Sequence, residues 1–451
     1  MPGSPTRRVL LIAHELPPSA GGGVQRLTKF ARLLVAEGWD VVAISAEPLP
    51  GRPRDGSLLT QIEGIPVHRL PARDVATGIA RVLAPLKRIR SRRVPPARHM
   101  TFSNSGSDDG AAAPVSGRSP LSARLTRWVA MPDGAVVWAA RVPAYAERLH
   151  RESPFDVILA SGPPFSTLVA GIRTGGRLGV PVVVDMRDAW KNAYHAEWPT
   201  ARRRRRFVEI EGEVMTAASA VVAVSEPIAA EVKEMGARRV TVLPNGFDPD
   251  EMPEWSPDPS SPLRLAFMGR LSPGSLDPTV LFSAIARARQ LDPFAMEGFA
   301  LDITGPDAPW AREMAVTLGV GDMVRFHPFK PYRDILEDVA RADCGVITLA
   351  DTPASAGVYS GKLFDYLGIG IPILVFGPHH SGAAALALET GCGRVVPGDD
   401  VELGARTLVE LAAAKKRGER GGPCRETVRA RFNRRDQVAR LSALLHEVIG
   451  D

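Results

Sequence analysis

Residues 9–45 read VLLIAHELPPSAGGGVQRLTKFARLLVAEGWDVVAIS, and this stretch decides the fold class. It contains two continuous runs of apolar residues, Val9–Ala13 and Val41–Ser45. Between them, apolar residues recur at i, i+3, i+4 and i+7 from Leu27 to Leu34, which is the spacing of one helix face. A strand, a glycine-rich loop, an amphipathic helix and a second strand indicate a βαβ unit in a parallel sheet buried on both faces.

The same alternation continues along the chain and restarts once. Further strands of the first series are predicted at Asp156–Ala160, Pro181–Asp185, Ala220–Ser225 and Val240–Leu243. The proline-rich segment Asp248–Pro262 then suits a linker between domains. A second series of strands is predicted at Leu263–Met268, Ala300–Thr304, Met323–His327, Cys344–Leu349 and Ile373–Phe376, followed by a helix over about Arg425–Ile449. We therefore predict an α/β protein with two doubly wound domains and a cleft between them.

The domain limits follow from this restart. We expect a first domain over residues 1–247, a second over residues 248–430 and a C-terminal helix over residues 431–451. Residues 91–122 are rich in Ser, Gly, Pro, Ala and Arg. This composition predicts a disordered insertion in the first domain.

Composition narrows the class of protein and its compartment. The 451 residues are 45% hydrophobic and 24% charged, which is typical of a globular chain. No apolar run approaches the roughly 18–20 residues of a membrane span, and the run at 9–13 is too short for a signal peptide. Cys344, Cys392 and Cys424 lie far apart without metal-ligand spacing, so we expect reduced thiols and a cytoplasmic protein.

The net charge of +6 is concentrated in two basic clusters, Arg81–Arg98 and Arg202–Arg206. An apolar stripe at 79–89 accompanies the first cluster. Together they are compatible with peripheral contact of this segment with the inner face of the plasma membrane. The alternative is a solvated loop. Neither cluster contains interleaved aromatic residues or a recognition element. No nucleic-acid partner is therefore expected.

Two short motifs follow predicted strands of the first domain. Gly21–Gly23 precede a helix at the carboxyl end of the first strand, where backbone N–H groups can approach an anionic ligand. The alternative is a flexible surface loop. Asp185-Met186-Arg187-Asp188 emerges from a buried strand, so its charged side chains are expected to face the cleft. The alternative is a structural Asp–Arg pair.

The densest motif is SGKLFDYLGIGIPI at residues 360–373, where a loop enters a short helix and a Gly-Ile-Pro turn returns to a strand. Lys362 and Asp365 share one helix face near its positive end. A lysine there suits phosphate, and a carboxylate suits the vicinal hydroxyls of a ribose; a solvated ion pair is the alternative. A Walker-type phosphate loop is excluded, because Ala356 and Leu363 occupy positions that require Gly and Ser or Thr.

Taken in order, six segments resemble the retaining GT-B glycosyltransferases of family 4. These segments are Leu16–Arg26, Asp185–Trp190, Val224-Ser225, Leu243–Asp248, Phe267–Arg270 and Lys362–Pro372. The resemblance implies two Rossmann-like domains, with a nucleotide-sugar donor on the second and a hydroxyl acceptor on the first. It also implies that the final helix crosses back to the first domain. The cleft segments contain no acidic metal-binding pair, so neither a metal nor a cofactor is expected.

The resemblance further implies roles for individual residues, with Arg270 on the donor diphosphate and Asp365 on the ribose. Catalytic roles fall on Arg270, Lys362, Asp185, Arg187 and Asp188. Donor binding falls on Gly22, Gly23, Gly269, Arg270, Gly357, Val358, Tyr359, Ser360, Gly361, Lys362 and Asp365. The acceptor side is expected to include Gln25, Arg26 and Asp188.

Two positions depart from the family pattern. The family has two glutamates eight positions apart; Asp365 stands at the second position, but Gly357 stands at the first. A basic partner for Arg270 is also expected shortly after it, yet residues 271–286 contain none before Arg287. We interpret Lys362 as the replacement for that charge.

These features predict a retaining glycosyltransferase that builds a cell-surface polysaccharide, a glycolipid or a glycosylated metabolite. Two alternatives remain open. A nucleotide-sugar epimerase of the same fold would need no acceptor. A non-catalytic glycosyltransferase-like subunit would bind and activate a partner enzyme, and Gly357 in place of a glutamate favours that interpretation.

Overall fold

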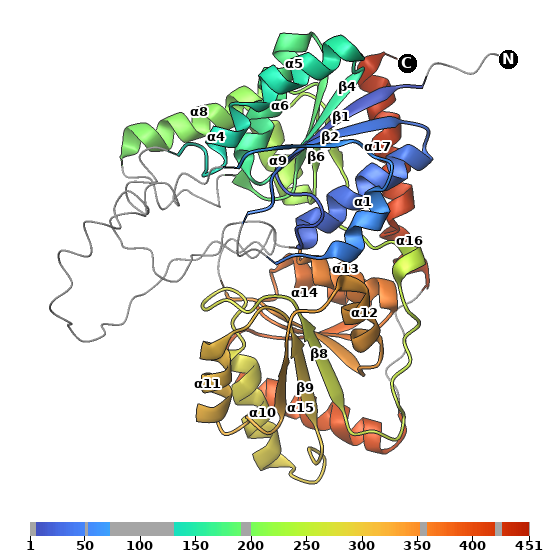
Figure 1. The fold of residues 1–451 in the computed structure, drawn as a ribbon. Coiled ribbons are helices and arrows are strands. Elements are labelled where there is room, and N and C mark those ends of the chain that lie inside the picture. The colour runs from blue at the N-terminus through green and yellow to red at the C-terminus, as the bar shows by residue number, and fades with distance from the viewer. Residues whose placement is uncertain are drawn as a thin grey trace, which may run out of the picture. The chain divides into compact units, whose positions relative to one another are not determined.

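The structure, a computed structural model, describes residues 6–49, 53–72, 130–190, 200–351, 359–419 and 426–450. The chain divides into two compact units (Figure 1). The first unit runs to Pro244 and takes up the chain again at Arg435, and the second runs from Asn245 to Arg434. The predicted insertion at 91–122 and the basic cluster at 81–98 lie outside the described residues.

A parallel sheet of seven strands forms the centre of the first unit, in the order β3-β2-β1-β4-β5-β6-β7. All neighbouring strands are parallel, so each connection crosses over the sheet. The strands are β1 (Arg8–Ala13), β2 (Asp40–Ala46), β3 (Val67–Leu70), β4 (Val157–Gly162), β5 (Val182–Met186), β6 (Ala220–Ala223) and β7 (Val240–Val242).

Helices cover both faces of this sheet. On one face, α1 (Gly22–Ala36) and α17 (Arg434–Ile449) bury apolar residues such as Phe30 and Leu441 against the strands. The C-terminal helix, red in Figure 1, therefore packs on the first unit. The other face is covered by α4 (Val136–Ala139), α5 (Val142–Glu152), α6 (Phe165–Leu178), α8 (Ala201–Ala217) and α9 (Glu226–Glu234), and a 3-10 helix, η1, spans Gly56–Ile62.

The second unit is built around a parallel sheet of six strands in the order β10-β9-β8-β11-β12-β13. The central position of β8 and β11 places their carboxyl ends side by side. The strands are β8 (Arg264–Met268), β9 (Ala300–Thr304), β10 (Val324–His327), β11 (Cys344–Thr348), β12 (Ile373–Phe376) and β13 (Gly393–Val396).

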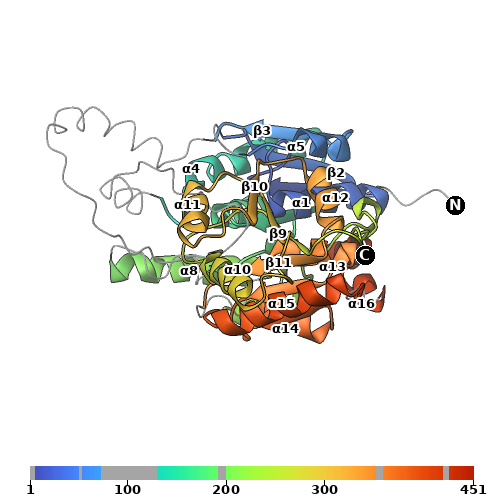
Figure 2. The same cartoon turned by 90° about the horizontal axis from the view of Figure 1, so that it is seen from below.

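This second sheet is also covered on both faces. One face carries α10 (Thr279–Leu291), α11 (Pro309–Thr317) and α15 (Val401–Lys416), with α10 and α15 side by side in Figure 2. The other face carries α12 (Tyr332–Ala340), α13 (Gly361–Ile369), α14 (Gly382–Glu389) and α16 (Glu426–Arg431). A short 3-10 helix, η2, spans Pro249–Glu251. Two apolar layers therefore enclose the sheet, as its uninterrupted apolar strands require.

The structure confirms the predicted fold class of two Rossmann-like parallel-sheet units. All the strands expected from apolar runs are present, but two were missed, β3 and β13. Both lie at a sheet edge and include polar residues, His68 and Arg69 in β3 and Arg394 in β13. An edge strand has only one neighbour and is less buried, so it does not require a continuous apolar sequence.

The segment predicted to be helical over about Arg425–Ile449 forms two helices, α16 and α17, with a short interruption between them. Phe247 N–H donates to the Phe432 carbonyl at 3.1 Å, and Arg434 N–H donates to the Phe247 carbonyl at 2.9 Å. Residues 432–433 thus form a turn, and Asn433 makes an isolated bridge with Phe247 in the segment that begins the second unit. This pairing places the two chain crossings between the units next to each other in the second unit.

The proline-rich segment after Asp248 packs along the second unit. Trp255 Nε1 donates to the Ala342 carbonyl at 2.9 Å, and Ser256 N–H donates to the Ala340 carbonyl at 2.9 Å. These bonds hold the segment to the last residue of α12 and to Ala342, two residues beyond it. The prolines therefore shape an irregular but anchored stretch of the second unit.

The cysteines only partly match the expectation of reduced thiols. Cys344 is free and buried, and burial raises the pKa of its thiol to about 12. Cys392, by contrast, is disulfide-bonded, which corrects the sequence prediction at that position. Within the described ranges, none of the helices combines the length and apolar character needed to cross a membrane.

Candidate functional site

Loops at the carboxyl ends of parallel strands are where open α/β sheets bind ligands, and most of the predicted site residues lie there. In the first unit these loops follow β1, β4 and β5. In the second unit they follow β8 and β11. Each unit is described here by itself.

Asp185 and Arg26 form a fully buried ion pair in the first unit. Arg26 Nη2 lies 2.8 Å from Asp185 Oδ1, and Ser161 Oγ donates to Asp185 Oδ2 at 2.6 Å. Both charged side chains are 0% exposed. Arg26 also donates to the carbonyls of Leu243 and Pro244, each at 3.0 Å. The pair therefore joins α1, β4, β5 and the end of the first unit.

Arg187, two residues further on, lies against the glycine loop. Its guanidinium group is so close to Gly23 that a Cβ atom there would lie 1.5 Å from Nη1. Arg187 is 7% exposed, and its Nη2 donates to the Pro163 carbonyl after β4. A side chain at position 23 would thus require the guanidinium group of Arg187 to move.

Helix α1, which begins beside Arg187, has no side-chain cap at its N-terminus. Gly21 is the N-cap residue of α1, with φ 143°, and no side chain caps the first turn. Gly22 is the first helical residue, and Gln25 Oε1 is buried without a hydrogen-bond partner in the described part of the chain. The first-turn N–H groups have no intrahelical acceptor, so this end of α1 carries a positive potential.

Two further residues of the segment Asp185–Trp190, Trp190 and Asp188, differ in their surroundings. Trp190 is fully buried and stacks on Phe165, with the ring centroids 4.6 Å apart. Its part is to fix the loop after β5 against α6. Asp188 is half-buried and lies between Arg187 and this anchor in the chain.

In the second unit, the structure brings Gly269 and Lys362 together. Gly269 follows β8 with φ 102°, a conformation that side chains disfavour, and a Cβ on Gly305 would lie 2.1 Å from the Gly269 carbonyl oxygen. Lys362 is 5% exposed, and its Nζ lies 4.2 Å from the centroid of the Phe267 ring. A Cβ on Gly269 would be 3.7 Å from that Nζ. The lysine therefore emerges from α13 beside the end of β8.

The other predicted donor residues surround this point or fall outside the description. Arg270 is half-buried and makes no hydrogen bond or ion pair with the residues that the structure describes. Ser360 is buried and is the N-cap residue of α13, and Gly361 begins the helix. The Tyr359 ring packs toward Gly382 of α14. Gly357 and Val358 lie outside the described residues.

Asp365 has a partner that the sequence did not reveal. Tyr332, the first residue of α12, donates from its hydroxyl to Asp365 Oδ1 at 2.5 Å. Burial, together with the nearby Asp365 charge, raises the pKa of Tyr332 well above its usual value. The tyrosine therefore stays protonated and orients the carboxylate. The two residues are far apart in sequence and share no motif, so no local pattern could have paired them.

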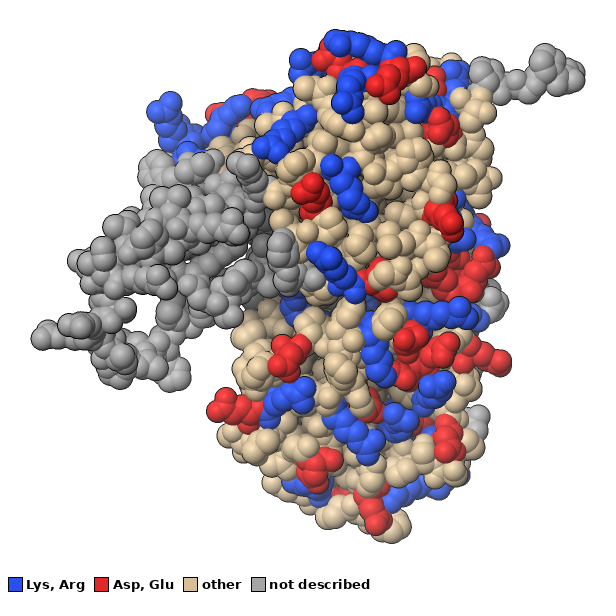
Figure 3. All heavy atoms as spheres, in the orientation of Figure 1, with Lys and Arg blue, Asp and Glu red and all other residues tan. Residues whose placement is uncertain are grey.

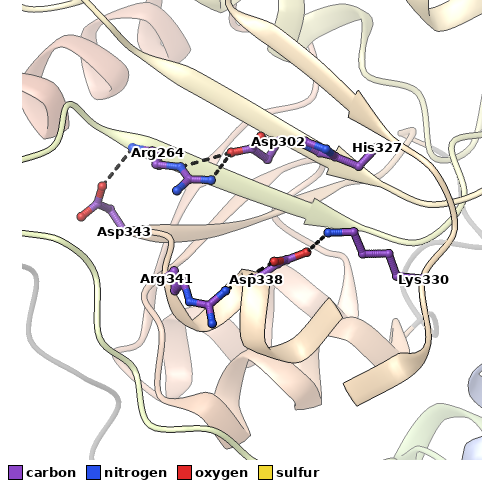
Figure 4. A network of polar contacts seen from close by, with 7 residues as sticks. All are labelled: Arg264, Asp302, His327, Lys330, Asp338, Arg341 and Asp343. Carbon is purple, nitrogen blue, oxygen red and sulfur yellow. Dashed lines mark hydrogen bonds and ion pairs between the residues drawn. The ribbon is translucent and has the colours of Figure 1, made fainter. Parts of the chain in front are cut away.

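A polar network at the β9–β10 side of the second sheet was also missed (Figure 4). Asp302 accepts from Arg264 Nη2 at 2.8 Å and lies 2.7 Å from His327 Nε2. Burial favours the neutral acid, but the hydrogen bonds from His327 and Arg264 outweigh it and lower the pKa of Asp302. A cavity of about 200 Å³ lies at the ends of β9 and β10, lined by residues that include Gly305, Asp307, Arg312, Phe326 and His327.

Charged residues of both signs are interspersed over the face drawn in Figure 3. The second basic cluster lies on the exposed helix α8, where Arg206 Nη1 is 2.6 Å from Glu213 Oε1 and 3.3 Å from Glu209 Oε2. These hydrogen bonds raise the pKa of the Arg206 guanidinium. Arg206 of this cluster thus has counter-ions on its own helix. Over the described ranges, no three His, Cys, Asp or Glu side chains are grouped so as to hold a metal ion.

The two Rossmann-like units have the GT-B fold. Residues 78–246 match the family model of a glycosyl transferase 4-like domain. No curated protein sequence matches the chain significantly.

Solved structures are similar to nearly the whole chain. Sucrose-phosphate synthase from Thermosynechococcus elongatus has a TM-score of 0.61 and 14% identity, covering 98% of this chain and 99% of that one. WaaG, a glycosyltransferase involved in lipopolysaccharide biosynthesis, has a TM-score of 0.54 and 14% identity, covering 98% and 100%. A Listeria monocytogenes protein assigned as a UDP-N-acetylglucosamine 2-epimerase has a TM-score of 0.54 and 11% identity, covering 99% and 97%. At these identities the likeness establishes the fold.

Proposed function

We propose that the protein is a retaining glycosyltransferase that moves a sugar from a nucleoside-diphosphate sugar to a hydroxyl acceptor. The observation that carries this proposal is the position of Lys362. This buried lysine lies in the first turn of α13 and next to Gly269. A fixed cation, loop backbone and the first turn of a helix are the groups that a diphosphate requires. The glycosyl transferase 4-like match and the GT-B fold support the same function.

The chemistry follows from where charge develops. When the sugar leaves, the transition state resembles an oxocarbenium ion and negative charge grows on the diphosphate. Lys362, Arg270 and the first-turn N–H groups of α13 stabilise that charge, which strengthens the interaction during reaction. In a retaining transfer, the departing phosphate oxygen accepts the proton of the attacking hydroxyl on the same face of the sugar.

The nucleoside is assigned to the same face of α13, one turn further along the helix. Asp365 is proposed to accept hydrogen bonds from the ribose hydroxyls, and Tyr332 holds its carboxylate in place. Both ends of the donor then rest on one helix, because Lys362 and Asp365 are three positions apart. The base is left to neighbouring loops of the second unit.

The acceptor is assigned to the first unit, at the loops after β1 and β5. We place the reaction at the cytoplasmic side of the membrane, in the synthesis of a cell-surface polysaccharide, a glycolipid or a glycosylated metabolite. The basic segment at 81–98 would make the peripheral contact with anionic lipid. Gly23, Gln25, Arg187 and Asp188 are the predicted residues that this assignment retains near the substrates.

The test begins with the nucleotide. Thermal unfolding of the full chain with UDP, GDP, ADP and TDP identifies the bound base, since a ligand present at 100 times its Kd stabilises the native state by about 2.7 kcal/mol. Sugar transfer from the matching donor is then measured with an acceptor panel, and the anomeric configuration of the product is read from proton NMR couplings. We expect retention, and turnover that persists in EDTA because cations of the chain neutralise the diphosphate.

The alternatives give different results in the same assay. An epimerase would convert the donor sugar without an acceptor. A non-catalytic subunit would bind nucleotide but turn over nothing as the purified chain. An inverted product, or activity lost in EDTA and restored by Mg²⁺, would contradict the mechanism proposed above.

A further inference from the structure

The pairing of β8 with β11 in the second unit stops before either strand ends. Two residue pairs align, the second of them Gly345 with Ala266. Strand β8 nevertheless continues to Met268 alongside β9, and β11 continues to Thr348 alongside β12. The two central strands therefore separate toward their carboxyl ends, which is where open α/β sheets bind ligands.

The hydroxyl of Tyr366, a residue of α13, bridges the two strands where their pairing ends. It accepts from the Met268 N–H at 3.3 Å, and it lies 3.2 Å from each of the carbonyl oxygens of Ala266 and Val346. A phenol hydroxyl donates one hydrogen bond and also accepts, so it can donate to either carbonyl while it accepts from Met268. Its bonds therefore replace part of the missing ladder between β8 and β11.

The ring that carries this hydroxyl is fully buried and packs on the backbone of β11. A Cβ atom on Gly345 would lie 2.7 Å from Cδ2 and 2.8 Å from Cγ of the Tyr366 ring. The absence of a side chain at Gly345 thus makes room for the ring. With the ring in this place, β8 and β11 cannot continue their pairing beyond Gly345.

The residue held by the hydroxyl directly precedes the turn assigned to the diphosphate. On its other side, the Gly269 N–H donates to the Thr304 carbonyl of β9 at 2.9 Å. The backbone that leads into Gly269 and Arg270 is therefore fixed from β9 and, through Tyr366, from α13. Lys362 lies four positions before Tyr366 on the same face of α13, so one helix face both supports this turn and contributes the cation beside it.

We propose that Tyr366 is a positioning residue, whose hydroxyl holds the carboxyl ends of β8 and β11 apart and thereby sets the place of Gly269 and Arg270 for the donor diphosphate. The identity of the ligand rests on the proposed function. Because the hydroxyl is buried between the strands, it acts through the backbone of β8. The nucleoside is assigned to Asp365, which has its own support from Tyr332, so the contribution of Tyr366 is confined to the phosphates.

Calorimetric titration of the full chain tests this division, with the nucleoside diphosphate that binds among UDP, GDP, ADP and TDP and with the corresponding nucleoside. Tyr366→Phe keeps the ring and removes the hydroxyl. Displacement of one charged hydrogen bond to phosphate predicts that diphosphate affinity falls about tenfold, while nucleoside affinity stays within about twofold. An unchanged diphosphate affinity, or an equal loss for the nucleoside, would overturn the proposal.

A second variant moves the hydroxyl without removing it. In Gly345→Ala the new methyl group would overlap the Tyr366 ring, so the hydroxyl must leave its place and the same selective loss of diphosphate affinity is expected. Tyr145→Phe is the matched control, since it removes a hydroxyl that contacts His68 in the first unit, and it should bind both ligands as the wild type does. Wild-type diphosphate affinity in Gly345→Ala would also contradict the proposal.

Hydrogen–deuterium exchange gives a readout that needs no ligand. In Tyr366→Phe, a peptide that spans the end of β8 should exchange faster, and by a larger factor than a peptide from β9, because the Met268 N–H has lost its acceptor. Equal changes in both peptides would show a general loss of stability and would contradict a local positioning role. If exchange rises at the end of β8 but the wild type binds none of the nucleotides, the proposed function fails while the support of this turn by Tyr366 stands.

Discussion

The two units share a fold but place their candidate anion sites after different strands. In the first unit, the glycine loop and α1 follow β1 directly along the chain. In the second unit, Gly269 follows β8, but the helix that carries Lys362 is α13, which follows β11. The two meet because β8 and β11 are neighbours in the sheet. Adjacency in the sheet, rather than in the sequence, decides which helix N-terminus faces a given loop.

Individual buried cations differ in how their charge is compensated. Arg26 is fully buried and bonded to Asp185, while Arg187 is nearly as buried without a carboxylate in the described residues. Lys362, 5% exposed, lies over an aromatic ring in the second unit. Burial alone thus does not identify a functional cation. The group that each cation contacts is more informative. The following variants distinguish Arg26, Arg187 and Lys362.

Breaking the buried pair of the first unit should have the largest effect. Asp185→Leu leaves Arg26 buried without a carboxylate, and the expected loss is about 3–5 kcal/mol in the free energy of unfolding of the first unit. Denaturant unfolding followed by tryptophan fluorescence measures it. The double variant Arg26→Met/Asp185→Leu should recover most of the loss.

Arg187→Gln provides the contrast in the same experiment. Among the described residues, Arg187 has no carboxylate partner, so its replacement leaves no buried carboxylate without a counter-ion. The replacement should therefore lower the free energy of unfolding by less than about 1 kcal/mol or increase it. Equal losses in Asp185→Leu and Arg187→Gln would show that the two arginines are not different in kind.

The cation of the second unit should affect turnover instead of stability. Lys362→Met removes charge stabilisation that grows in the transition state, so turnover should fall about 10²–10³-fold while the donor Kd rises much less. Single-turnover kinetics and nucleotide binding separate the two quantities. Lys416→Met, which removes an exposed lysine at the C-terminal end of α15 in the same unit, is the control and should retain normal turnover. Equal kinetics in both variants would exclude Lys362 from the reaction.

Most of the fold was predictable because parallel strands buried on both faces leave a strong pattern. Leu263–Met268 and Ala300–Thr304 are examples in which the apolar run and the strand nearly coincide. Strands β3 and β13 escaped prediction because an edge strand needs no such run. The break at 432–433 escaped because the helical pattern around it is continuous and the competing partner, Phe247, is remote in sequence.

The positions of the candidate residues could be predicted from the sequence, but their contacts could not. The glycines and charged residues of the motifs follow strands in the structure, as the sequence pattern indicated. The sequence did not show that Asp185 forms an ion pair with Arg26 or that Arg187 packs against Gly23. It also did not show that the Tyr332 hydroxyl donates a hydrogen bond to Asp365. Each of these contacts joins segments far apart in the chain, so only the packed structure determines them.

A smaller effect is expected from the residue that orients the ribose-binding carboxylate. Tyr332→Phe removes the hydroxyl that donates to Asp365, and a hydrogen bond to a charged group is worth about 1.5–3 kcal/mol. The donor Kd should therefore rise about tenfold or more with little change in turnover at saturation, since the ribose contact exists in the ground state and the transition state alike. Tyr145→Phe in the first unit, whose hydroxyl contacts His68, is the control. A fall in turnover without a change in Kd would place Tyr332 elsewhere in the mechanism.

The smallest effect is expected from the partly exposed network in Figure 4, which is the counterpart of the buried pair in the first unit. Asp302 is 13% exposed, but Arg264 and His327 are 40% and 37% exposed, so water screens the pair. Asp302→Asn should therefore lower the free energy of unfolding by about 1 kcal/mol or less at pH 7, well below the loss in Asp185→Leu.

The sign of the pH dependence follows from the lowered pKa of Asp302. A depressed carboxyl pKa contributes stability above the unfolded-state value of about 3.9, and that contribution is lost as the pH falls through the lower native-state value. The difference in stability between wild type and Asp302→Asn should thus be present at pH 7 and shrink steadily below about pH 4 in urea unfolding curves. A difference that persists undiminished in acid, or one as large as that of Asp185→Leu, would mean that the network stabilises the second unit by packing rather than by charge.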